Sequence, residues 1–365
     1  MTDLISIAVL GAGNAGRALA GDLARIGADV VLWNRTPDHV AEIAEVGGVE
    51  LEGEVTGFGH LRRVTSDLGE ALADTGLILV CVPAFGHRDV AAACAPYLRD
   101  DHIVVLNPGR TFGALEFIHE LRANQCPADP VVSEAATFIF ASRSSGPAQS
   151  LIARIKHAVP VAAIPSARTK DVLAVLKPWY PQFTDAESTL DTSFANVGAV
   201  VHPAITLLNA ARIENTQGRF DFYIDGVSPG VGRVLEAVDR ERLAVAQLLG
   251  VPVRSMQEWL ESAYRATGRD LYEAIQANEG YRGITAPPSM DNRYLREDVP
   301  YSMVPMASAG RGFGLTPRAI EAVIDLAGLV HETNYRSRGR TLGALGLEGL
   351  SPAEIRRVAS DGYGA

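Results

Sequence analysis

A glycine-rich turn between an apolar run and a helical pattern constrains this chain more than any other feature. The run Ile5–Leu10 leads directly into Gly11-Ala12-Gly13-Asn14-Ala15-Gly16, which has the spacing G-x-G-x-x-G, and a helix-forming stretch follows. A second apolar run, Asp29–Trp33, comes at the spacing of one β-α-β unit. This order predicts a parallel sheet with a phosphate-binding turn at the start of its first helix.

The three glycines of this turn have separate expected roles. Gly11 permits the tight turn, Gly13 lets the backbone approach a pyrophosphate, and Gly16 lets the helix pack against the strand. The alternative is that the glycines only close a turn, but the strand before them and the helix after them are the context that supports a binding motif. We therefore expect a dinucleotide to bind at Gly11, Gly13, Asn14, Ala15 and Gly16.

The end of the second run indicates which dinucleotide is used. An acidic residue there would bind the ribose 2′-hydroxyl of NAD and repel a 2′-phosphate, whereas this chain has Asn34-Arg35-Thr36. A guanidinium can hold a phosphate through two hydrogen bonds, and Asn34 and Thr36 add neutral polar groups. The sequence thus predicts NADP(H) in preference to NAD(H). The alternative for Arg35 is an ordinary surface arginine, and the nearby Asp38 weakens the prediction slightly.

Two later strand ends are also expected to line the cofactor cleft. Val82 and Pro83 end one apolar run, and Asn107 and Gly109 follow the next. The carboxyl ends of strands in a doubly wound sheet lie beside the dinucleotide. Pro, Asn and Gly are also common turn formers, so a role in the turn alone is the alternative for each of them.

The first half of the chain alternates between two periodicities. At 365 residues the chain has the length of about two domains. In the first half, short β-branched runs alternate with amphipathic stretches, which is typical of a parallel sheet covered by helices. The predicted strands are 5–10, 30–33, 77–82, 103–106, 131–134 and 159–164, and the predicted helices between them include 16–26, 89–97 and 115–123.

After Pro165 the pattern becomes almost entirely helical. The predicted helices here are 169–180, 188–213, 230–249, 255–266, 270–277, 317–330 and 351–359. The predicted fold class is therefore α/β plus all-α. A Rossmann-type doubly wound domain that binds NADP(H) is expected over residues 1–186, and a helical domain for substrate binding and catalysis over residues 187–365.

Composition argues against several classes of function. Lys and Arg number 33 against 43 Asp and Glu, a net charge of −10 without any basic run, so nucleic-acid binding is not expected. Cys81, Cys94 and Cys126 form neither a CxxC pair nor a disulfide framework, which is typical of a reducing cytoplasm, and no metal site is expected. The run 5–10 is too short to span a bilayer, so we expect a soluble, cytoplasmic protein that does not bind membranes.

Two stretches of the helical half carry candidate catalytic groups. His202 lies in an apolar helical pattern and is followed by Pro203, which is expected to kink that helix. The charged stretch 291–300 offers a guanidinium at Arg293 and a carboxylate at Asp298. A His paired with an Asp suits proton transfer near neutral pH. A structural histidine and a solvated loop are the alternatives, since sequence spacing does not show that His202 and Asp298 meet.

Beyond these motifs, the whole chain resembles the octopine/nopaline (opine) dehydrogenase family. The resemblance runs in the same order from near residue 6 to near residue 350, and its His-Pro and Arg-Tyr stretches are specific to that family. The matching stretches are Ala8-Val9-Leu10-Gly11-x-Gly13-Asn14-x-Gly16, Val82-Pro83-Ala84, Leu106-Asn107-Pro108-Gly109, Gly113-Ala114-Leu115-Glu116-Phe117, His202-Pro203, Leu207-Leu208-Asn209-Ala210-Ala211-Arg212, Tyr281-Arg282-Gly283-Ile284, Arg293-Tyr294, Glu297-Asp298-Val299 and Gly339-Arg340-Thr341-Leu342.

The resemblance implies a reaction and three residue roles. Members of this family condense the amine of an amino acid with a 2-oxo acid, usually pyruvate, and reduce the resulting imine with a nicotinamide hydride. The resemblance also implies that His202 is the general acid and base, that Asp298 is its partner, and that Arg293 binds a substrate carboxylate. The pair Asn34-Arg35 stands where one member of that family has an acidic residue, which favours NADPH and leaves the amine substrate open.

Two other functions remain as alternatives. Ketopantoate and glycerol-phosphate reductases join a similar nucleotide domain to a helical one, but they usually place a catalytic lysine in the second domain, and this chain has Lys170 and Lys177 near the junction and no lysine after residue 186. A redox sensor that binds NADP(H) without catalysis is the other alternative. In each case the partners are small molecules, and the apolar helical half indicates a homodimer.

Overall fold

The computed structural model describes residues 5–364, which form two compact units. The first unit runs to Gly109 and also includes Gly113–Thr192 and the segment that begins at Arg357, while the second comprises Arg110–Phe112 and Ser193–Arg356. The sequence analysis places a single division at residue 186. In the structure, by contrast, two short segments belong to a different unit from their neighbours along the chain.

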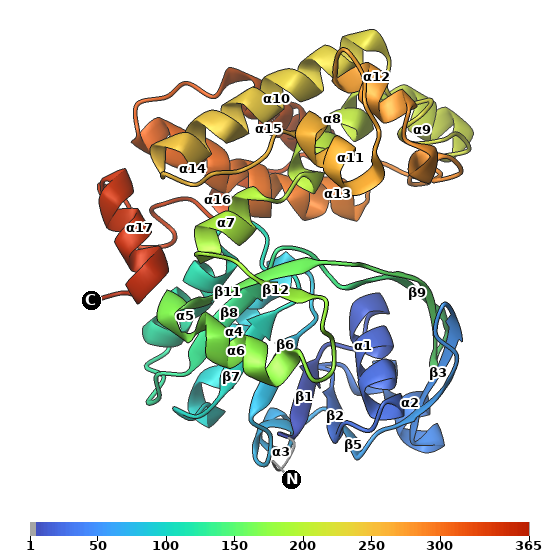
Figure 1. Cartoon of the computed structure of the whole chain (residues 1–365), viewed down its shortest axis with the longest axis vertical. Helices are drawn as coiled ribbons and strands as arrows, with labels where there is room; N and C mark the ends of the chain where they lie inside the picture. The colour runs from blue at the N-terminus through green and yellow to red at the C-terminus, as the bar shows by residue number, and fades with distance from the viewer. Residues whose placement is uncertain (1–4, 365) are drawn as a thin grey trace. The chain divides into compact units, whose positions relative to one another are not determined.

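The larger sheet of the first unit has, within residues 5–364, the strand order β12-β11-β8-β7-β6-β1-β2-β5 (Figure 1). The six neighbouring strands β8, β7, β6, β1, β2 and β5 all pair in parallel. The chain order reverses beside β1, which is the doubly wound topology that was predicted. Strand β11 departs from the predicted parallel pairing, because it runs antiparallel to β8. The strands are β1 (Ile7–Leu10), β2 (Val30–Trp33), β5 (Arg63–Thr65), β6 (Leu77–Val80), β7 (Ile103–Leu106), β8 (Val131–Ala135), β11 (Val159–Ile164) and β12 (Phe183–Asp185).

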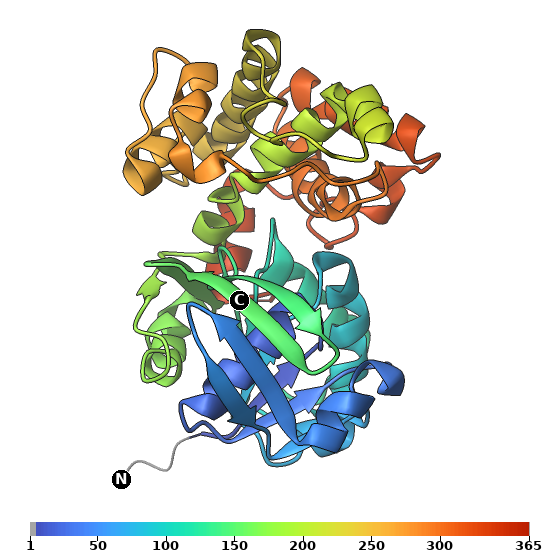
Figure 2. The same ribbon diagram turned by 90° about the vertical axis from the view of Figure 1, so that its right-hand side faces the viewer.

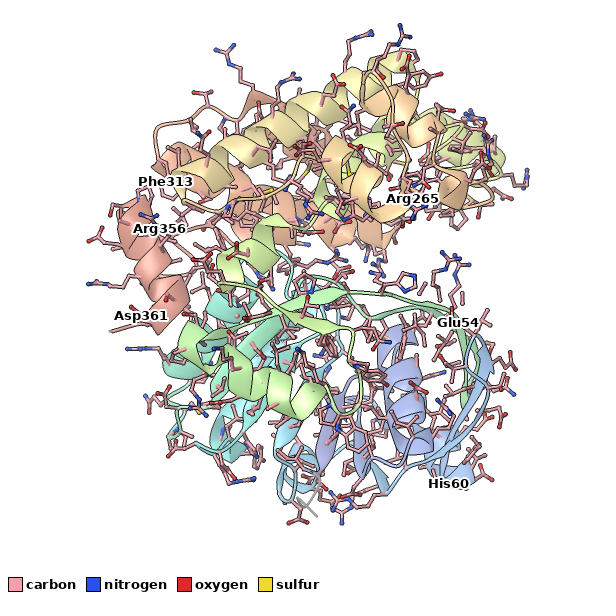
Figure 3. The ribbon with its side chains drawn as sticks, in the orientation of Figure 1. Glu54, His60, Arg265, Phe313, Arg356 and Asp361 are labelled. Atoms are coloured by element: carbon pink, nitrogen blue, oxygen red, sulfur yellow. The ribbon has the colours of Figure 1, made fainter. Side chains whose placement is uncertain are left out.

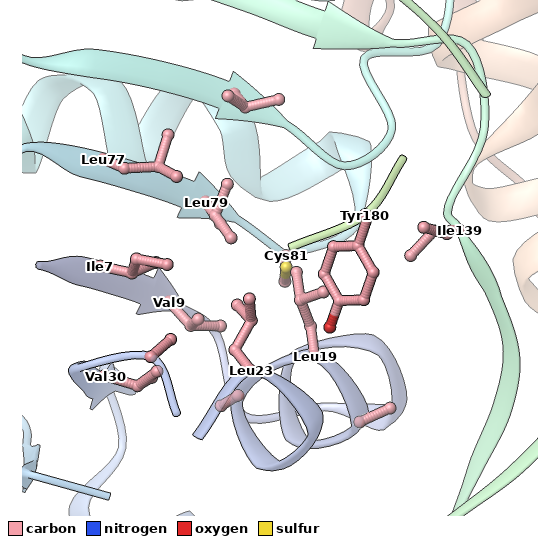
Figure 4. Packing of buried hydrophobic residues seen from close by; sticks show 14 of the residues in the cluster. Ile7, Val9, Leu19, Leu23, Val30, Leu77, Leu79, Cys81, Ile139 and Tyr180 are labelled. Atoms are coloured by element: carbon pink, nitrogen blue, oxygen red, sulfur yellow. The ribbon is translucent and has the colours of Figure 1, made fainter. Parts of the chain in front are cut away.

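The central strands of this sheet are buried along their whole length, as their uninterrupted apolar sequences require. Figure 4 shows Leu19 and Leu23 of helix α1 among side chains from β1 and β6, with Tyr180 beside them. This core fixes where α1 starts relative to the end of β1. The helices of the first unit are α1 (Asn14–Arg25), η1 (Pro37–His39), α2 (Ala41–Val46), α3 (Leu68–Leu72), η2 (Ala84–Gly86), α4 (His87–Cys94), η3 (Ala95–Tyr97), α5 (Gly113–Ala123), η4 (Ser166–Arg168) and α6 (Thr169–Leu176).

A second sheet in the first unit was not predicted. Its order among the described residues is β4-β3-β10-β9, and it packs against α1 (Figure 2). The strands are β3 (Gly48–Gly53), β4 (Gly57–His60), β9 (Phe140–Gly146) and β10 (Gln149–Ile155), and Figure 3 labels Glu54 and His60 at the ends of the β3–β4 hairpin. Many of its residues are small or polar and one face is exposed, so the apolar pattern that identifies strands is weak here.

The second unit is helical, as predicted, but its first helix is broken. The predicted helix 188–213 divides into α7 (Thr189–Phe194), α8 (Gly198–Leu208) and α9 (Ala210–Thr216), whereas Pro203 lies inside the uninterrupted α8. The second break falls at Asn209, whose side chain donates to the carbonyl groups of Ile205 and Gly226 and so competes with helical bonding.

Helix α8 packs against α10, α13, α15 and η6 of this unit. The helices over residues 293–312 were not predicted, because they are short or interrupted by prolines. The remaining helices are α10 (Pro229–Leu248), α11 (Met256–Tyr264), α12 (Leu271–Gln276), η5 (Glu279–Tyr281), α13 (Arg293–Arg296), η6 (Val299–Met303), α14 (Val304–Gly312), α15 (Arg318–Val330) and α16 (Tyr335–Arg338), and α17 (Pro352–Asp361) crosses into the first unit.

Within residues 5–364, no single helix has both the length and the hydropathy to cross a bilayer. By length and composition alone, the segment Thr189–Leu208 taken together with Ala210–Thr216 meets that requirement, but the two parts are bent by 69°.

Candidate active site

The glycine-rich turn joins β1 to α1 and has the backbone geometry that its sequence demands. Gly11 has φ +111°, a conformation that side chains rarely adopt, and its N–H donates to the Trp33 carbonyl at 2.8 Å. A Cβ at Gly16 would lie 1.7 Å from the carbonyl oxygen of Gly11, so α1 can approach the turn this closely only with glycine. At Gly13, by contrast, a Cβ would have open space around it: apart from the adjoining backbone, no atom of the described residues lies within 4 Å.

This arrangement fits the pyrophosphate of a dinucleotide. Gly13 and Asn14 are exposed at the N-terminus of α1, where backbone N–H groups lack helical partners and favour an anion. The side-chain oxygen of Asn34 accepts a hydrogen bond from the N–H of Ala12 at 3.1 Å, so Asn34 supports the turn. The space that Gly13 leaves open is where a phosphate group can approach the backbone.

Arg17 is a residue that sequence analysis did not select. Its guanidinium donates to the carbonyl groups of Ala12 at 2.7 Å and Gly146 at 2.8 Å, and so ties the turn to β9. Partial burial lowers the pKa of Arg17 from its usual value. Its place one residue after the motif was the only signal in the sequence, and an arginine there is not distinctive.

The other predicted cofactor residues differ in their accessibility. The Arg35 side chain is 77% exposed and forms an ion pair with Asp89 at 3.2 Å, while Thr36 and Pro83 are exposed and Val82 is half-buried. Asn107 and Gly109 are buried. The Asn107 side chain donates to the Val105 carbonyl at 3.0 Å. The N–H of Gly109 donates to the Ala135 carbonyl at 3.2 Å, and a Cβ at Gly109 would lie 2.3 Å from the Glu134 carboxylate.

The second unit brings together His202 of α8 and Asp298, which immediately precedes η6. Nδ1 of His202 lies 2.8 Å from Oδ2 of Asp298, although 96 positions separate the residues in the sequence. Because a carboxylate only accepts, Nδ1 carries the proton of this bond. A Cβ at Gly198 would lie 3.1 Å from the imidazole, so the glycine one turn earlier gives the ring its space.

Tyr223 and Tyr294 complete the surroundings of the imidazole. The Tyr223 hydroxyl lies 3.0 Å from Nε2 of His202, and the Tyr294 ring stacks on the imidazole with centroids 4.2 Å apart. Tyr223 in turn stacks on Tyr281, with centroids 4.0 Å apart. Burial, followed by the neighbouring tyrosines, raises the pKa of Tyr223 well above its usual value, so its hydroxyl keeps a proton that it can donate to Nε2.

Buried charges lie behind Asp298. The guanidinium of Arg110 donates to both carboxylate oxygens of Glu297, at 3.3 and 3.1 Å, and lies 3.4 Å from Oδ1 of Asp298. Burial by itself raises the pKa of Asp298, but the charge of Arg110 and the hydrogen bond with His202 outweigh it, and the pKa lies below its usual value. The pKa of Glu297 is lowered in the same way, because Arg110 outweighs burial.

Arg293 has a different environment. Its side chain is 68% exposed on α13 and its Nε lies 3.7 Å from Glu297, so it shares the anionic side of this cluster but faces solvent. The structure thus brings His202, Asp298 and Arg293 into one cluster, and it adds Arg110, Glu297 and Tyr223. In the sequence, Glu297 could have been found because it lies in the charged stretch 291–300. No motif or spacing in the sequence connects Arg110 or Tyr223 with His202.

In the described part of the chain, no group of His, Cys, Asp or Glu residues is arranged to hold a metal ion. The side-chain amide of Asn196 donates to the Ser302 hydroxyl at 2.8 Å, which ties the residues before α8 to η6. The groups that the second unit brings together around His202 are an imidazole, a carboxylate, a tyrosine hydroxyl and a guanidinium.

Comparison with known families places both units. Residues 185–331 match the family described as NAD/NADP octopine/nopaline dehydrogenase, alpha-helical domain, and residues 7–159 match the family described as ketopantoate reductase PanE/ApbA. The second match ends inside the first unit, so it concerns the nucleotide-binding fold. The helical unit, which holds the His202 cluster, matches the dehydrogenase family.

Individual relatives are similar to this chain over nearly its whole length. The chain is 40% identical to opine dehydrogenase of Arthrobacter sp. (strain 1C), over 98% of this chain and 99% of that protein, and 28% identical to vitopine synthase of Allorhizobium ampelinum, over 96% and 97%. A solved octopine dehydrogenase in complex with NADH and agmatine has the same fold, with a TM-score of 0.81 at 19% identity over 98% of both chains. The chain therefore belongs to the opine dehydrogenase family of NAD(P)-dependent oxidoreductases, which act on CH–NH bonds.

Proposed function

We propose that this chain joins an amino acid or other amine to a 2-oxo acid such as pyruvate and reduces the resulting imine with NADPH. The observation that carries the proposal is the pairing of His202 with Asp298 at 2.8 Å in the helical unit of an opine dehydrogenase family member. The exposed guanidinium of Arg293 in the same cluster offers a binding group for a carboxylate.

His202 is the group that moves protons in this proposal. The attack of the amine on the 2-oxo acid gives a carbinolamine, and its C–O bond breaks when the hydroxyl receives a proton and leaves as water. A protonated Nε2 can supply that proton, while Asp298 stabilises the imidazolium through Nδ1. The substrate hydroxyl then takes the place at Nε2 that the Tyr223 hydroxyl holds in the structure.

The remaining groups bind and orient. Arg293 holds a substrate carboxylate, which matters because a chain with net charge −10 must bind two anionic substrates. When bound, NAD(P)H supplies the hydride that reduces the imine carbon. The turn from Gly11 to Gly16 holds its pyrophosphate, with Val82, Pro83, Asn107 and Gly109 at the neighbouring strand ends.

NADPH is proposed as the preferred cofactor because of Arg35 and its neighbours Asn34 and Thr36. Arg35 lies two positions after the end of β2, and its side chain is 77% exposed. Among the described residues, its ion-pair partner is the exposed Asp89. Such pairs contribute little, so a 2′-phosphate can displace Asp89. The relatives of known structure include both an NADH complex and an NADP+ complex, of octopine and yersinopine dehydrogenase respectively.

One assay tests the proposal. NADPH oxidation is followed with pyruvate alone, with a set of amino acids alone, and with both, and the product is analysed by mass spectrometry after reaction with NADPH deuterated at the transferred position. We expect oxidation that needs both substrates, and a product that carries deuterium at the new C–H bond. Equal rates with pyruvate alone would refute imine reduction.

Further arms of this assay address the alternatives. In two further arms, ketopantoate or dihydroxyacetone phosphate is the sole substrate. Rapid NADPH oxidation in either arm would show that the protein is a ketone reductase. Tight NADPH binding with no turnover on any substrate would point to the redox sensor instead.

A homodimer and a cytoplasmic location belong to the same proposal. An apolar groove of about 430 Å³ lies between α8, α10 and α15 and is lined in part by Leu326, which is 46% exposed. Leu329, which is 76% exposed, follows three positions later on α15. An exposed apolar surface of this kind suits a second copy of the chain. Analytical ultracentrifugation should give twice the monomer mass, and Leu329→Lys should shift the protein toward monomer. A monomeric parent protein would contradict the proposed dimer.

The proposed cytoplasmic location rests on the three free cysteines, which fit a reducing compartment.

A further inference from the structure

The segment Arg110–Phe112 is built into the helical unit although β7 and α5, which flank it in the sequence, belong to the first unit. The N–H of Thr111 donates to the Tyr301 carbonyl at 3.1 Å, the Thr111 carbonyl accepts from the buried Arg340 at 3.0 Å, and the N–H of Phe112 donates to the Ser193 hydroxyl at 2.9 Å. The backbone of this segment is therefore fixed on every side within the second unit.

The backbone of Arg110 is also strained. Arg110 and Phe112 both have φ +62°, in the left-handed region that residues other than glycine seldom occupy. Such conformations persist only where the surroundings determine them, and they concentrate at functional sites. Here the strained conformation directs a long charged side chain into the protein, so that only 10% of it is exposed.

The Arg110 side chain meets two adjacent buried carboxylates. It binds Glu297 through two hydrogen bonds, and its Nη1 lies 3.4 Å from Oδ1 of Asp298. The Asp298 side chain is 1% exposed, and Oδ1 has no hydrogen-bond partner within residues 5–364. A nearby cation stabilises a buried carboxylate in this situation, and Arg110 places its guanidinium beside that oxygen while His202 binds the other one.

We propose that Arg110 is a positioning residue for the acid–base pair, holding the ionised Asp298 oriented toward Nδ1 of His202. The inference rests on the proposed role of His202. It goes beyond that role because it assigns a function to a residue that touches neither His202 nor any expected substrate group in the structure. The strain at Arg110 and the two bonds to Glu297 fix the guanidinium, and the guanidinium fixes Asp298.

The charges around the imidazole decide the direction of the expected effect. The titratable and charged groups that face His202 or lie behind Asp298 are Tyr223, Tyr294, Asp298, Arg110, Glu297 and Arg293. Removing the Arg110 charge removes a cation near the imidazole, so His202 should hold its proton to higher pH. Removing the Asp298 charge has the opposite sign, because the imidazolium loses its stabilising anion.

The test compares Arg110→Met with Asp298→Asn in the full chain. In Arg110→Met we expect turnover to fall about tenfold, since the pair is less well oriented, and the pH midpoint of turnover to rise by about one unit. In Asp298→Asn the midpoint should fall. Arg110→Lys keeps the charge without the planar fork, so its midpoint should stay close to that of the parent protein while turnover is still reduced.

Arg242 offers a matched control. It is also a fully buried arginine of the helical unit and is paired with Asp239, and its other hydrogen bonds go to the carbonyl groups of Phe194 and Arg254. Arg242→Met should lower the melting temperature without moving the midpoint. If Arg110 were only structural, Arg110→Met would behave in the same way, and an unchanged or lowered midpoint in Arg110→Met overturns the proposal.

A double variant tests the same proposal if Arg110→Met does not fold. Arg110→Met/Glu297→Leu replaces the buried ion pair by apolar side chains, a change that proteins often tolerate. Its turnover should still fall about tenfold because Asp298 remains without its guanidinium; turnover equal to that of the parent protein would refute the positioning role.

The His202 titration can also be followed by NMR without any substrate, with the signal assigned by its loss in His202→Ala. This separates the two hypotheses. Absence of imine reduction in the parent protein defeats the proposed function, whereas a His202 titration that does not respond to Arg110→Met defeats the role of Arg110.

Discussion

The two units build their candidate sites from different materials. In the first unit, the turn from Gly11 to Gly16 offers backbone N–H groups and open space, and its shape is fixed by backbone contacts such as Gly11 to Trp33. In the second unit, the site consists of side chains, and three of them, Arg110, Glu297 and Asp298, are charged and buried. A backbone site depends on where a Cβ would collide, whereas a side-chain site depends on the chemistry of each residue.

This difference changes what a substitution does. Backbone N–H groups need no particular side chain, so most positions of the turn should tolerate alanine, and the exceptions are those where the structure has no room. In the buried cluster, the loss of one charge leaves another without its partner, which is strongly unfavourable in a medium of low polarity. Variants of the turn should therefore affect binding or folding, and variants of the cluster should affect turnover and its pH dependence.

The largest expected effect is on the side-chain site. His202→Ala should leave NADPH binding intact and lower turnover about a hundredfold or more, because general acid–base catalysis contributes about 10²–10⁴. The control is His331→Ala, which removes another partly buried histidine of the helical unit, one that contacts the Met290 carbonyl at 3.1 Å. Steady-state kinetics and NADPH titration decide the outcome, and full turnover in His202→Ala would make it a packing residue.

The backbone site should respond to position rather than to chemistry. In Gly16→Ala the new Cβ meets the Gly11 carbonyl oxygen, so we expect a loss of about 3 kcal/mol of stability together with weaker cofactor binding. Gly13→Ala should fold normally, because nothing lies within 4 Å of its Cβ and its φ is −77°, and should weaken cofactor binding alone. Thermal melts and NADPH titrations compare the two variants. Equal melting temperatures would show that the clash at Gly16 is relieved.

The same contrast explains what the sequence could predict. The turn, the parallel strands around it and the main helices of the second half follow from local patterns, since each apolar run or glycine spacing lies in one short segment. The sheet β4-β3-β10-β9 does not, because its strands are partly exposed and rich in small or polar residues, and because β3 pairs with β10, about a hundred positions away.

For the candidate site, residue types could be predicted but not their neighbours. His202 and Asp298 were selected from their local surroundings and from the family resemblance, and the structure adds their distance. Arg110 was passed over because it follows a strand end of the nucleotide-binding half, and only the folded chain places it beside Glu297. Tyr223 lies in an irregular connection between α9 and α10, where periodicity carries no information.

A smaller effect is expected at the edge of the backbone site, where a side chain does matter. Arg35→Ala should reduce the preference for NADPH over NADH by about tenfold to a hundredfold, because a charge-assisted pair with the 2′-phosphate is lost. Asp89→Asn should act in the opposite direction and by less, since it frees Arg35 from its partner at 3.2 Å. The ratio of kcat/KM for the two cofactors is the measurement, and a parent protein with no preference would contradict the assignment of Arg35.

The smallest of these effects is expected from Arg293, which is the exposed member of the side-chain site. If Arg293 holds a substrate carboxylate, Arg293→Ala should raise the KM for the 2-oxo acid about tenfold, and turnover should fall as well only where the clamp also orients the imine. Arg296 is the matched control: it lies on the same helix, is 60% exposed against 68% for Arg293, and pairs with Asp291 rather than with Glu297. Arg296→Ala should leave KM unchanged, so a similar rise in both variants would mean that the helix contributes only general positive charge. A rise confined to Arg293→Ala would instead show that the solvent-facing edge of the cluster also depends on an individual side chain. Within residues 5–364, the carboxylate paired with Arg293 is that of Glu297 at 3.7 Å, and an ion pair with so exposed an arginine is weak, so a bound carboxylate can compete with it.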